Sequence, residues 1–132
     1  MTRDEIEKLT IDFTAAFNRD DLDGVMGYFA HDGVYEQLDD RRAIGKAAIR
    51  AAFEPQLRGD FGEMRFAQED LFVDAAAGKA MISWTCTLHT RRGRAAWRGL
   101  DLLHWRGGEL VLKQTYCKAK VPLLESVSKK TT

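Results

Sequence analysis

The second half of the chain contains four long strand patterns joined by short turns, and this feature most restricts the possible folds. Between Lys79 and Thr90, large apolar side chains alternate with smaller or polar ones, so one face of the strand is strongly apolar. Further strands are predicted over residues 64–74, 95–105 and 110–119. Strands joined by such short turns pair as hairpins, so we expect a mostly antiparallel sheet.

The first half of the chain has helical patterns instead. Thr2 and Glu5 form a capping box before apolar residues at helical spacing, which predicts a helix over residues 3–18. Residues 45–53 are rich in helix formers. Pro55 is expected near the end of this helix, because proline disrupts a helix interior.

The segment AFNRDDLDGVMGYFAHDGVYE, residues 16–36, connects the first helix to a strand. Its acidic connector offers caps for a short helix, which is predicted over residues 22–29. The sequence His31-Asp32-Gly33 is typical of a turn, and a strand is predicted over residues 33–38. The polar residues 39–42 are expected to form a loop.

Helices that precede hairpin-connected strands indicate an α+β fold, with three N-terminal helices packed on one face of a curved sheet. A chain of 132 residues is most simply one domain, which we place at residues 1–120. Residues 121–132 are predicted to be a frayed C-terminal tail. A domain of this size can hold one core and one internal cavity.

The composition argues against several classes of function. The formal net charge is zero, so no overall field favours nucleic acid, and no apolar run is long enough to span a membrane. The charged N-terminus is unlike a signal peptide, so we expect a cytoplasmic protein with Cys86 and Cys117 as reduced thiols. No residue spacing indicates a metal site or a nucleotide cofactor.

Three motifs in this order resemble the SnoaL-like and ketosteroid-isomerase branch of the nuclear-transport-factor-2-like superfamily. The first is the segment of residues 16–36. The second is GKAAIRAAF, residues 45–53, and the third is GLDLLHWRGGEL, residues 99–110. The resemblance covers about residues 9–119 and implies a cone-shaped α+β barrel with a pocket. It does not define the reaction, because this fold supports many functions.

The residues that carry the chemistry of ketosteroid isomerases are only partly present. In that family an aspartate removes a proton next to a ketone, while a tyrosine and a protonated aspartic acid donate hydrogen bonds to the oxyanion. The resemblance places Phe13 at the tyrosine, Gln37 at or next to the base, and Asp101 at the oxyanion aspartic acid. Two of the three groups are absent, which argues against steroid isomerisation.

Asp101 is therefore the main candidate for a functional residue. If Trp97, Asp101 and Leu103 share one face of their strand, they form an apolar pocket wall with one carboxyl group. Burial there would favour the neutral carboxyl, which is a hydrogen-bond donor or a general acid. The alternative is a structural carboxylate that is hydrogen-bonded to Trp84, Tyr116 or the backbone.

Further residues are expected around the same pocket. Glu36 is the candidate partner of Asp101 in acid and base chemistry, although alternation lets only one of Tyr35 and Glu36 point inward. Gln114 is predicted to lie beside Asp101. The complete set of predicted pocket-lining residues is Phe13, Tyr28, Tyr35, Trp84, Trp97, Leu103, Gln114 and Tyr116.

The opposite face of the same strand carries Arg98, Leu100, Leu102 and His104. The resemblance implies that this outer face pairs two subunits, so we expect a homodimer. We predict a protein whose pocket binds a small apolar or aromatic molecule. Its predicted activity is that of an isomerase, cyclase or dehydratase in which an acid assists the reaction. The alternative is a non-catalytic ligand-binding or dimerisation module of the same fold.

Overall fold

A computed structural model describes residues 1–118 of the chain. Within these residues, three helices and six strands follow one another: α1 Arg3–Asn18, α2 Leu22–Gly27, β1 Phe29–Glu36, β2 Arg42–Ile44, α3 Lys46–Leu57, β3 Glu63–Asp74, β4 Lys79–Thr90, β5 Gly93–Arg106 and β6 Glu109–Cys117. The predicted tail, residues 121–132, lies outside the described residues. No helix in the described part is long and apolar enough to cross a membrane.

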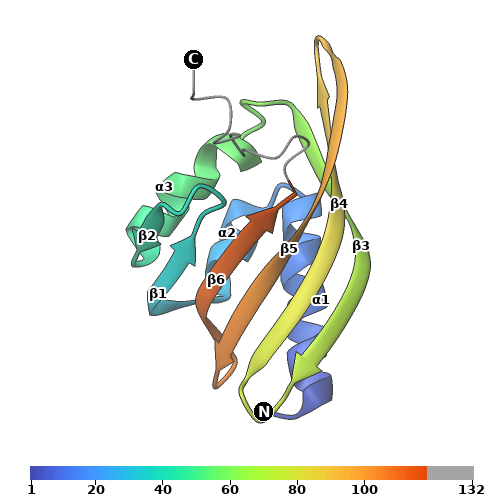
Figure 1. The fold of residues 1–132 in the computed structure, drawn as a ribbon. Helices are drawn as coiled ribbons and strands as arrows, with labels where there is room; N and C mark the ends of the chain where they lie inside the picture. The colour runs from blue at the N-terminus through green and yellow to red at the C-terminus, as the bar shows by residue number, and fades with distance from the viewer. Residues whose placement is uncertain (119–132) are drawn as a thin grey trace, which may run out of the picture.

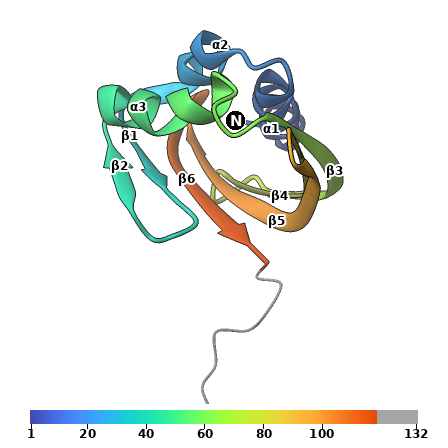
Figure 2. The same cartoon turned by 90° about the horizontal axis from the view of Figure 1, so that it is seen from above.

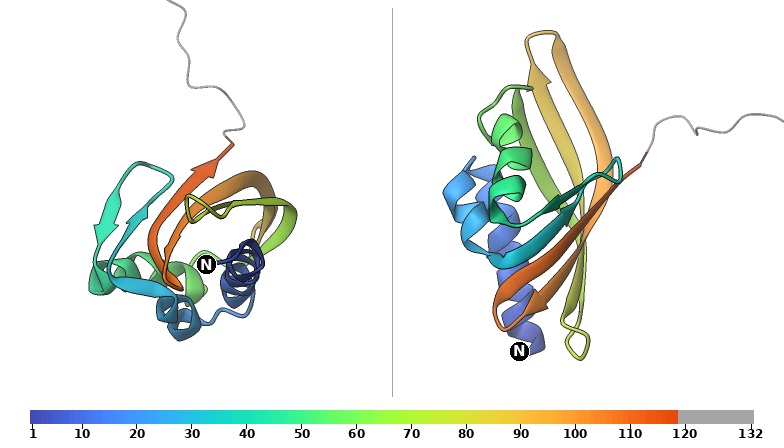
Figure 3. Two further views of the ribbon diagram at one scale, coloured as in Figure 1. Left: turned by 90° about the horizontal axis from the view of Figure 1, so that it is seen from below. Right: turned by 90° about the vertical axis from the view of Figure 1, so that its left-hand side faces the viewer.

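The strands form one sheet in the order β2-β1-β6-β5-β4-β3. Neighbouring strands are antiparallel except β1 and β6, which are parallel. The sheet is strongly curved and the helices lie on its concave side (Figures 1 and 2). Seen from the side, the β4–β5 hairpin extends beyond the helices (Figure 3). The predicted architecture of helices packed on a curved, mostly antiparallel sheet is confirmed.

Helix α1 is held at both of its ends. At the first end Thr2 Oγ1 accepts a hydrogen bond from the Glu5 amide at 3.1 Å, which confirms the predicted capping box. At the other end the Asn18 side chain accepts from the Phe66 amide at 2.8 Å and donates to the Phe66 carbonyl at 2.9 Å. Because β3 is an edge strand, these two bonds satisfy backbone groups that no neighbouring strand pairs.

The region after α1 differs from the sequence prediction. Helix α2 ends at Gly27 and β1 begins at Phe29, so residues 31–33 lie inside a strand rather than in a turn. The pairing of β1 with β6 shifts register between Phe29 and Val34, so the turn-like residues mark an irregularity in the strand. Part of the predicted loop forms strand β2, which pairs with β1.

Helix α3 is longer than predicted and contains Pro55 in its last turn. It continues to Leu57 because this side chain is buried on the same face as Ile49 and Phe53. The three residues are four positions apart, which places them in a row along the helix. Tertiary packing therefore outweighs the local effect of the proline.

The core beneath the helices is built around Phe13, which is 1% exposed. Its ring makes edge-to-face contacts with Phe17, Tyr28, Phe29 and Trp105, at centroid distances between 5.2 and 6.2 Å. Such aromatic pairs stabilise a core beyond the area that they bury. The cluster of rings connects α1 to strands β1 and β5 of the sheet.

Replacing Phe13 tests this description of the core. Phe13→Ala should lower the free energy of unfolding by about 3–5 kcal/mol, because a buried ring is lost and a cavity remains. Urea unfolding followed by circular dichroism measures the change. Phe72→Ala is the matched control: Phe72 is 57% exposed, and its loss should cost less than about 0.5 kcal/mol. Similar losses in the two variants would contradict the proposed core.

Candidate functional site

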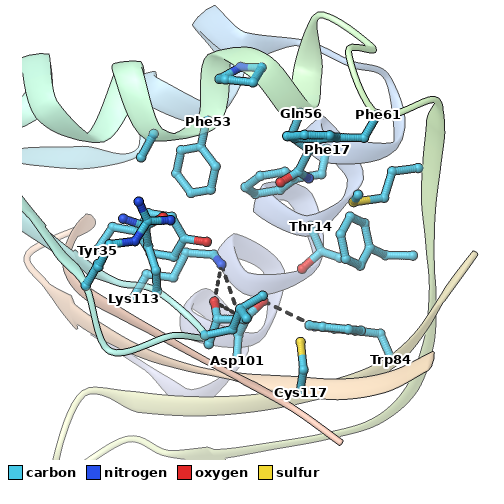
Figure 4. Close-up of a pocket in the computed structure, with 18 of the residues that line it drawn as sticks. Thr14, Phe17, Tyr35, Phe53, Gln56, Phe61, Trp84, Asp101, Lys113 and Cys117 are labelled. Atoms are coloured by element: carbon cyan, nitrogen blue, oxygen red, sulfur yellow. Dashed lines mark hydrogen bonds and ion pairs between the residues drawn. The ribbon is translucent and has the colours of Figure 1, made fainter. Parts of the chain in front are cut away.

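A cavity of about 440 Å³ lies between the helices and the concave face of the sheet. This volume is typical of natural sites for small molecules. Figure 4 shows the cavity with aromatic side chains on several sides and a charged pair at one end. The lining residues are Thr14, Phe17, Tyr35, Gln37, Leu38, Arg41, Ala51, Ala52, Phe53, Pro55, Gln56, Phe61, Met64, Phe66, Trp84, Trp97, Asp101, Lys113, Thr115 and Cys117.

Four buried side chains form a connected polar group, the ion-pair network, at this end of the cavity. Lys113 Nζ donates to Asp101 Oδ1 at 3.0 Å, and Thr115 Oγ1 donates to the same oxygen at 2.7 Å. Trp84 Nε1 donates to Asp101 Oδ2 at 3.2 Å. Lys113 is only 4% exposed and Asp101 7%. Both charges are therefore paired inside the protein, as buried charges must be.

The Lys113 ammonium is also surrounded by aromatic rings. Its nitrogen lies 4.6 Å from the ring centroid of Tyr35, 5.5 Å from that of Phe53 and 5.6 Å from that of Phe17. Burial lowers the pKa of Lys113, but the charge and hydrogen bond of Asp101 outweigh this effect, and the pKa is raised above its ordinary value. Lys113 is thus a cation at neutral pH, and ring faces stabilise it further.

The surroundings of Asp101 differ from the purely apolar ones that the prediction of a neutral carboxyl assumed. All three neighbours, Lys113, Thr115 and Trp84, donate hydrogen bonds to Asp101. A carboxyl group that accepts from an ammonium and two further donors acts as a carboxylate rather than as a donor. The apolar strand around Asp101 suggests desolvation, but the cation on the neighbouring strand compensates for it.

The inner face of β6 also differs from the sequence prediction. Lys113 and Thr115 line the cavity, whereas Gln114 and Tyr116 do not. Tyr116 is 50% exposed, and the Gln114 amide oxygen lies 2.7 Å from His104 Nε2, a residue of the outer face. Lys113 is the functional candidate that the sequence interpretation missed.

A bulge in β6 explains this difference. Trp105 pairs with Leu110 and His104 pairs with Leu112, so Val111 has no partner on β5. One extra residue reverses which side chains face inward beyond it. Strict alternation counted from the buried Leu110 therefore selects the wrong residues. The feature of the sequence that could have indicated a cation on β6 is Asp101 itself, because a buried carboxylate needs a partner.

The two candidate residues of β1 lie on opposite faces. Tyr35 points inward, is 8% exposed and stacks on Phe53 with ring centroids 4.4 Å apart. Glu36 lies on the outer side, where it accepts from Gln114 Nε2 at 3.3 Å and pairs with Arg42 at 3.7 Å. The structure therefore does not bring Glu36 to Asp101.

The remaining predicted pocket residues divide into two groups. Trp84 and Trp97 line the cavity together with Tyr35 and Asp101. Phe13, Tyr28 and Leu103 do not line it. Phe13 and Tyr28 pack against each other and against Trp105, and Leu103 is fully buried in the core. Of these three residues, Phe13 also packs against Phe17, which lines the cavity.

A glycine on β5 allows Trp84 to reach Asp101. Gly99 is directly opposite Trp84 in the β4–β5 pairing. A Cβ atom at Gly99 would lie 2.5 Å from Trp84 Cη2 and 2.6 Å from the Tyr116 carbonyl oxygen. The indole therefore occupies the space that a side chain would need, and its N–H reaches Asp101 on the same strand as Gly99.

Within residues 1–118, no group of three or more His, Cys, Asp or Glu residues is arranged to hold a metal ion. The charged groups that line the cavity are Arg41, Asp101 and Lys113. Arg41 is paired with Asp39 at 2.7 Å on the exposed side. The buried charged groups of the cavity are therefore Asp101 and Lys113 of the ion-pair network.

Comparison with known proteins gives one family match. A family model of the SnoaL-like domain matches residues 11–112. Among solved structures, a proposed polyketide cyclase from Xanthomonas campestris pv. campestris has a TM-score of 0.75 and 20% identity, covering 86% of this chain and 90% of that chain. No curated protein matches the chain.

Two further solved structures have the same fold. An NTF2-like protein of unknown function from Mesorhizobium loti has a TM-score of 0.74 and 21% identity, over 89% of this chain and 93% of that chain. TerC, co-crystallised with polyporic acid, has a TM-score of 0.72 and 16% identity, over 86% of this chain and 92% of that chain. At such low identity these structures establish the fold alone.

The close approach of Trp84 to Gly99 can be tested by adding a single methyl group. Gly99→Ala should destabilise the protein by about 1–3 kcal/mol, because the new Cβ overlaps the indole and a backbone carbonyl. Chemical unfolding measures the loss, and tryptophan fluorescence reports the altered indole environment. Gly27→Ala is the control, because a Cβ at this helical position meets nothing within 4 Å. A neutral Gly99→Ala variant would contradict the packing described.

Proposed function

The chain belongs to the SnoaL-like domain family, as its motifs indicated, and from this premise we propose that it binds a small apolar or aromatic molecule in its cavity. The observation that carries the proposal is a cavity of about 440 Å³ with a charged network at one end. An apolar pocket with a few polar groups at defined positions is the usual form of a small-molecule site.

The walls of the cavity support an aromatic ligand. Rings of Phe17, Tyr35, Phe53, Phe66 and Trp84 contribute to its lining. Aromatic faces pair favourably with the faces and edges of other rings. In contrast, buried charge is confined to one end, so a ligand with a largely apolar body and one polar group fits the distribution best.

Related structures support a role in the conversion of small molecules. They include a proposed polyketide cyclase and TerC with bound polyporic acid. An isomerase, cyclase or dehydratase reaction in this chain would use Asp101 and Lys113, because these are the buried charged groups that line the cavity. Glu36 would take no direct part, since it lies on the outer side of β1.

A ligand-binding protein without catalysis is the second candidate. The observation that favours it is that Asp101 already accepts three hydrogen bonds from protein donors. These donors occupy acceptor sites on both carboxylate oxygens, which a substrate would otherwise use. Both candidate functions require that the cavity binds a small molecule, so one binding experiment tests this shared requirement.

The cysteines support a proposal for location. Cys86 is fully buried, Cys117 is partly buried, and neither forms a disulfide. Burial raises the pKa of Cys86 to about 12, so its thiol stays protonated at neutral pH. Because disulfides are rare in the cytosol, two free thiols support the proposal of a cytoplasmic protein.

Blocking the cavity tests whether it binds small molecules. With saturating 2-ethylnaphthalene, an apolar aromatic probe, the wild-type Tm should rise by at least about 3 °C, because a ligand that binds the folded state stabilises it. Ala52→Trp should abolish this rise by filling the cavity that Ala52 lines. Ala48→Trp, at an exposed position of the same helix, is the control and should retain it. A wild-type Tm that no aromatic probe raises would contradict the proposal.

The outer face of the sheet supports a homodimer. Leu100, Leu102 and Leu112 are only partly buried there, and Tyr116 is 50% exposed. Apolar side chains gathered on one face are typical of an interaction surface. We propose that two copies of the chain pair through this face.

Sedimentation velocity tests this pairing. The wild-type protein should sediment as a dimer at micromolar concentration. Leu102→Glu should shift it to a monomer, because a charge in the centre of the face would be desolvated without a partner. Leu38→Glu is the control, since Leu38 is 64% exposed at the cavity rather than on the outer face. A wild-type monomer would overturn the proposal.

A further inference from the structure

Lys113 has one N–H group that no oxygen atom of the described residues accepts. An ammonium carries three N–H groups. Two of them are accounted for by Asp101 Oδ1 at 3.0 Å and Thr115 Oγ1 at 2.6 Å. Around the rest of the nitrogen lie the rings of Tyr35 and Phe53 and the cavity (Figure 4). A ligand in the cavity can therefore reach the third N–H group.

The charge balance of the cavity limits which ligand atom can do so. The positive charge of Lys113 is already neutralised by Asp101 at 3.0 Å. A second carboxylate beside Lys113 would place two negative charges around one cation where water is scarce, and their repulsion would be strong. A neutral oxygen acceptor forms the same hydrogen bond without this repulsion.

The third N–H group also sets a minimum requirement for the ligand. A pure hydrocarbon in the cavity would exclude water from Lys113 and leave this N–H group with ring faces but without an oxygen acceptor. An unpaired donor of a charged group is costly when buried. A ligand with a carbonyl oxygen at the correct position avoids this cost, whereas its hydrocarbon analogue does not.

We propose that Lys113 determines the specificity of the cavity by donating a hydrogen bond to a neutral carbonyl oxygen of the ligand. The ligand class is an aromatic ketone or quinone, in preference to a carboxylate or a hydrocarbon of the same shape. Asp101 is a positioning residue that holds the ammonium, and Trp84 and Thr115 hold Asp101. The inference rests on the proposed function, because it concerns the occupant of the same cavity.

Three probes with one ring system separate the alternatives. They are 2-acetylnaphthalene, 2-ethylnaphthalene and 2-naphthoate, which present a neutral carbonyl, no acceptor and a carboxylate. Calorimetric titration of the wild-type protein at neutral pH should show that the ketone binds about tenfold or more tightly than either analogue. Equal affinity of ketone and hydrocarbon, or tightest binding of the carboxylate, would overturn the inference.

A double variant assigns the preference to the ion-pair network. Lys113→Met together with Asp101→Asn removes both charges, and the asparagine retains an acceptor for Trp84. The variant should bind the ketone and the hydrocarbon within about twofold of each other. Arg58→Met, which removes a cation that pairs with Asp60 and does not line the cavity, is the control and should keep the wild-type preference. A double variant that keeps the preference would overturn the role of Lys113.

The outcomes distinguish this inference from the proposal on which it rests. If none of the three probes binds the wild-type protein, the cavity is not a site for aromatic molecules and both fail. If the three probes bind with similar affinity whatever oxygen atoms they carry, the cavity is a binding site and only the proposed role of Lys113 fails. The wild-type series decides between these outcomes even if the double variant does not fold.

Discussion

A lysine ammonium can be buried only if a partner compensates for the lost hydration, because an unpaired charge inside a protein costs several kcal/mol. The 3.0 Å contact between Lys113 and Asp101 meets this requirement at the centre of the molecule. Thr115 and Trp84 donate two further hydrogen bonds to the carboxylate. The rings of Phe17, Tyr35 and Phe53, which line the cavity, lie around the ammonium of this pair.

The geometry of the strands makes that arrangement possible. Gly99 leaves room for the Trp84 indole to lie across β5, and the unpaired Val111 turns Lys113 toward the concave face. The helices cover this face without filling it, since Phe13 and its neighbouring rings pack to one side of the cavity. Removing the bulge would place Lys113 on the outer face and leave Asp101 without a cation.

Much of the fold could be predicted because it depends on local patterns. The capping box at Thr2 and the alternation between Lys79 and Thr90 correctly predicted a helix and a strand. Less of the site could be predicted. Asp101 was expected to face inward and does so. Glu36 was expected beside it for acid and base chemistry but lies on the outer side of β1. The residue that pairs with Asp101 is Lys113, which the sequence did not indicate because a bulge that appears only in the pairing with β5 changes the register of β6.

The sequence by itself determined the α+β class, the order of the three helices and the five longer strands, and membership of the SnoaL-like family. Periodicity, capping and motif spacing are properties of the chain alone. Tertiary structure decided which side chains meet. The register of strands depends on their partners, and a single unpaired residue reverses the faces beyond it. For this reason the acid of the cavity is visible in the sequence, whereas the cation that pairs with it and lines the cavity is not.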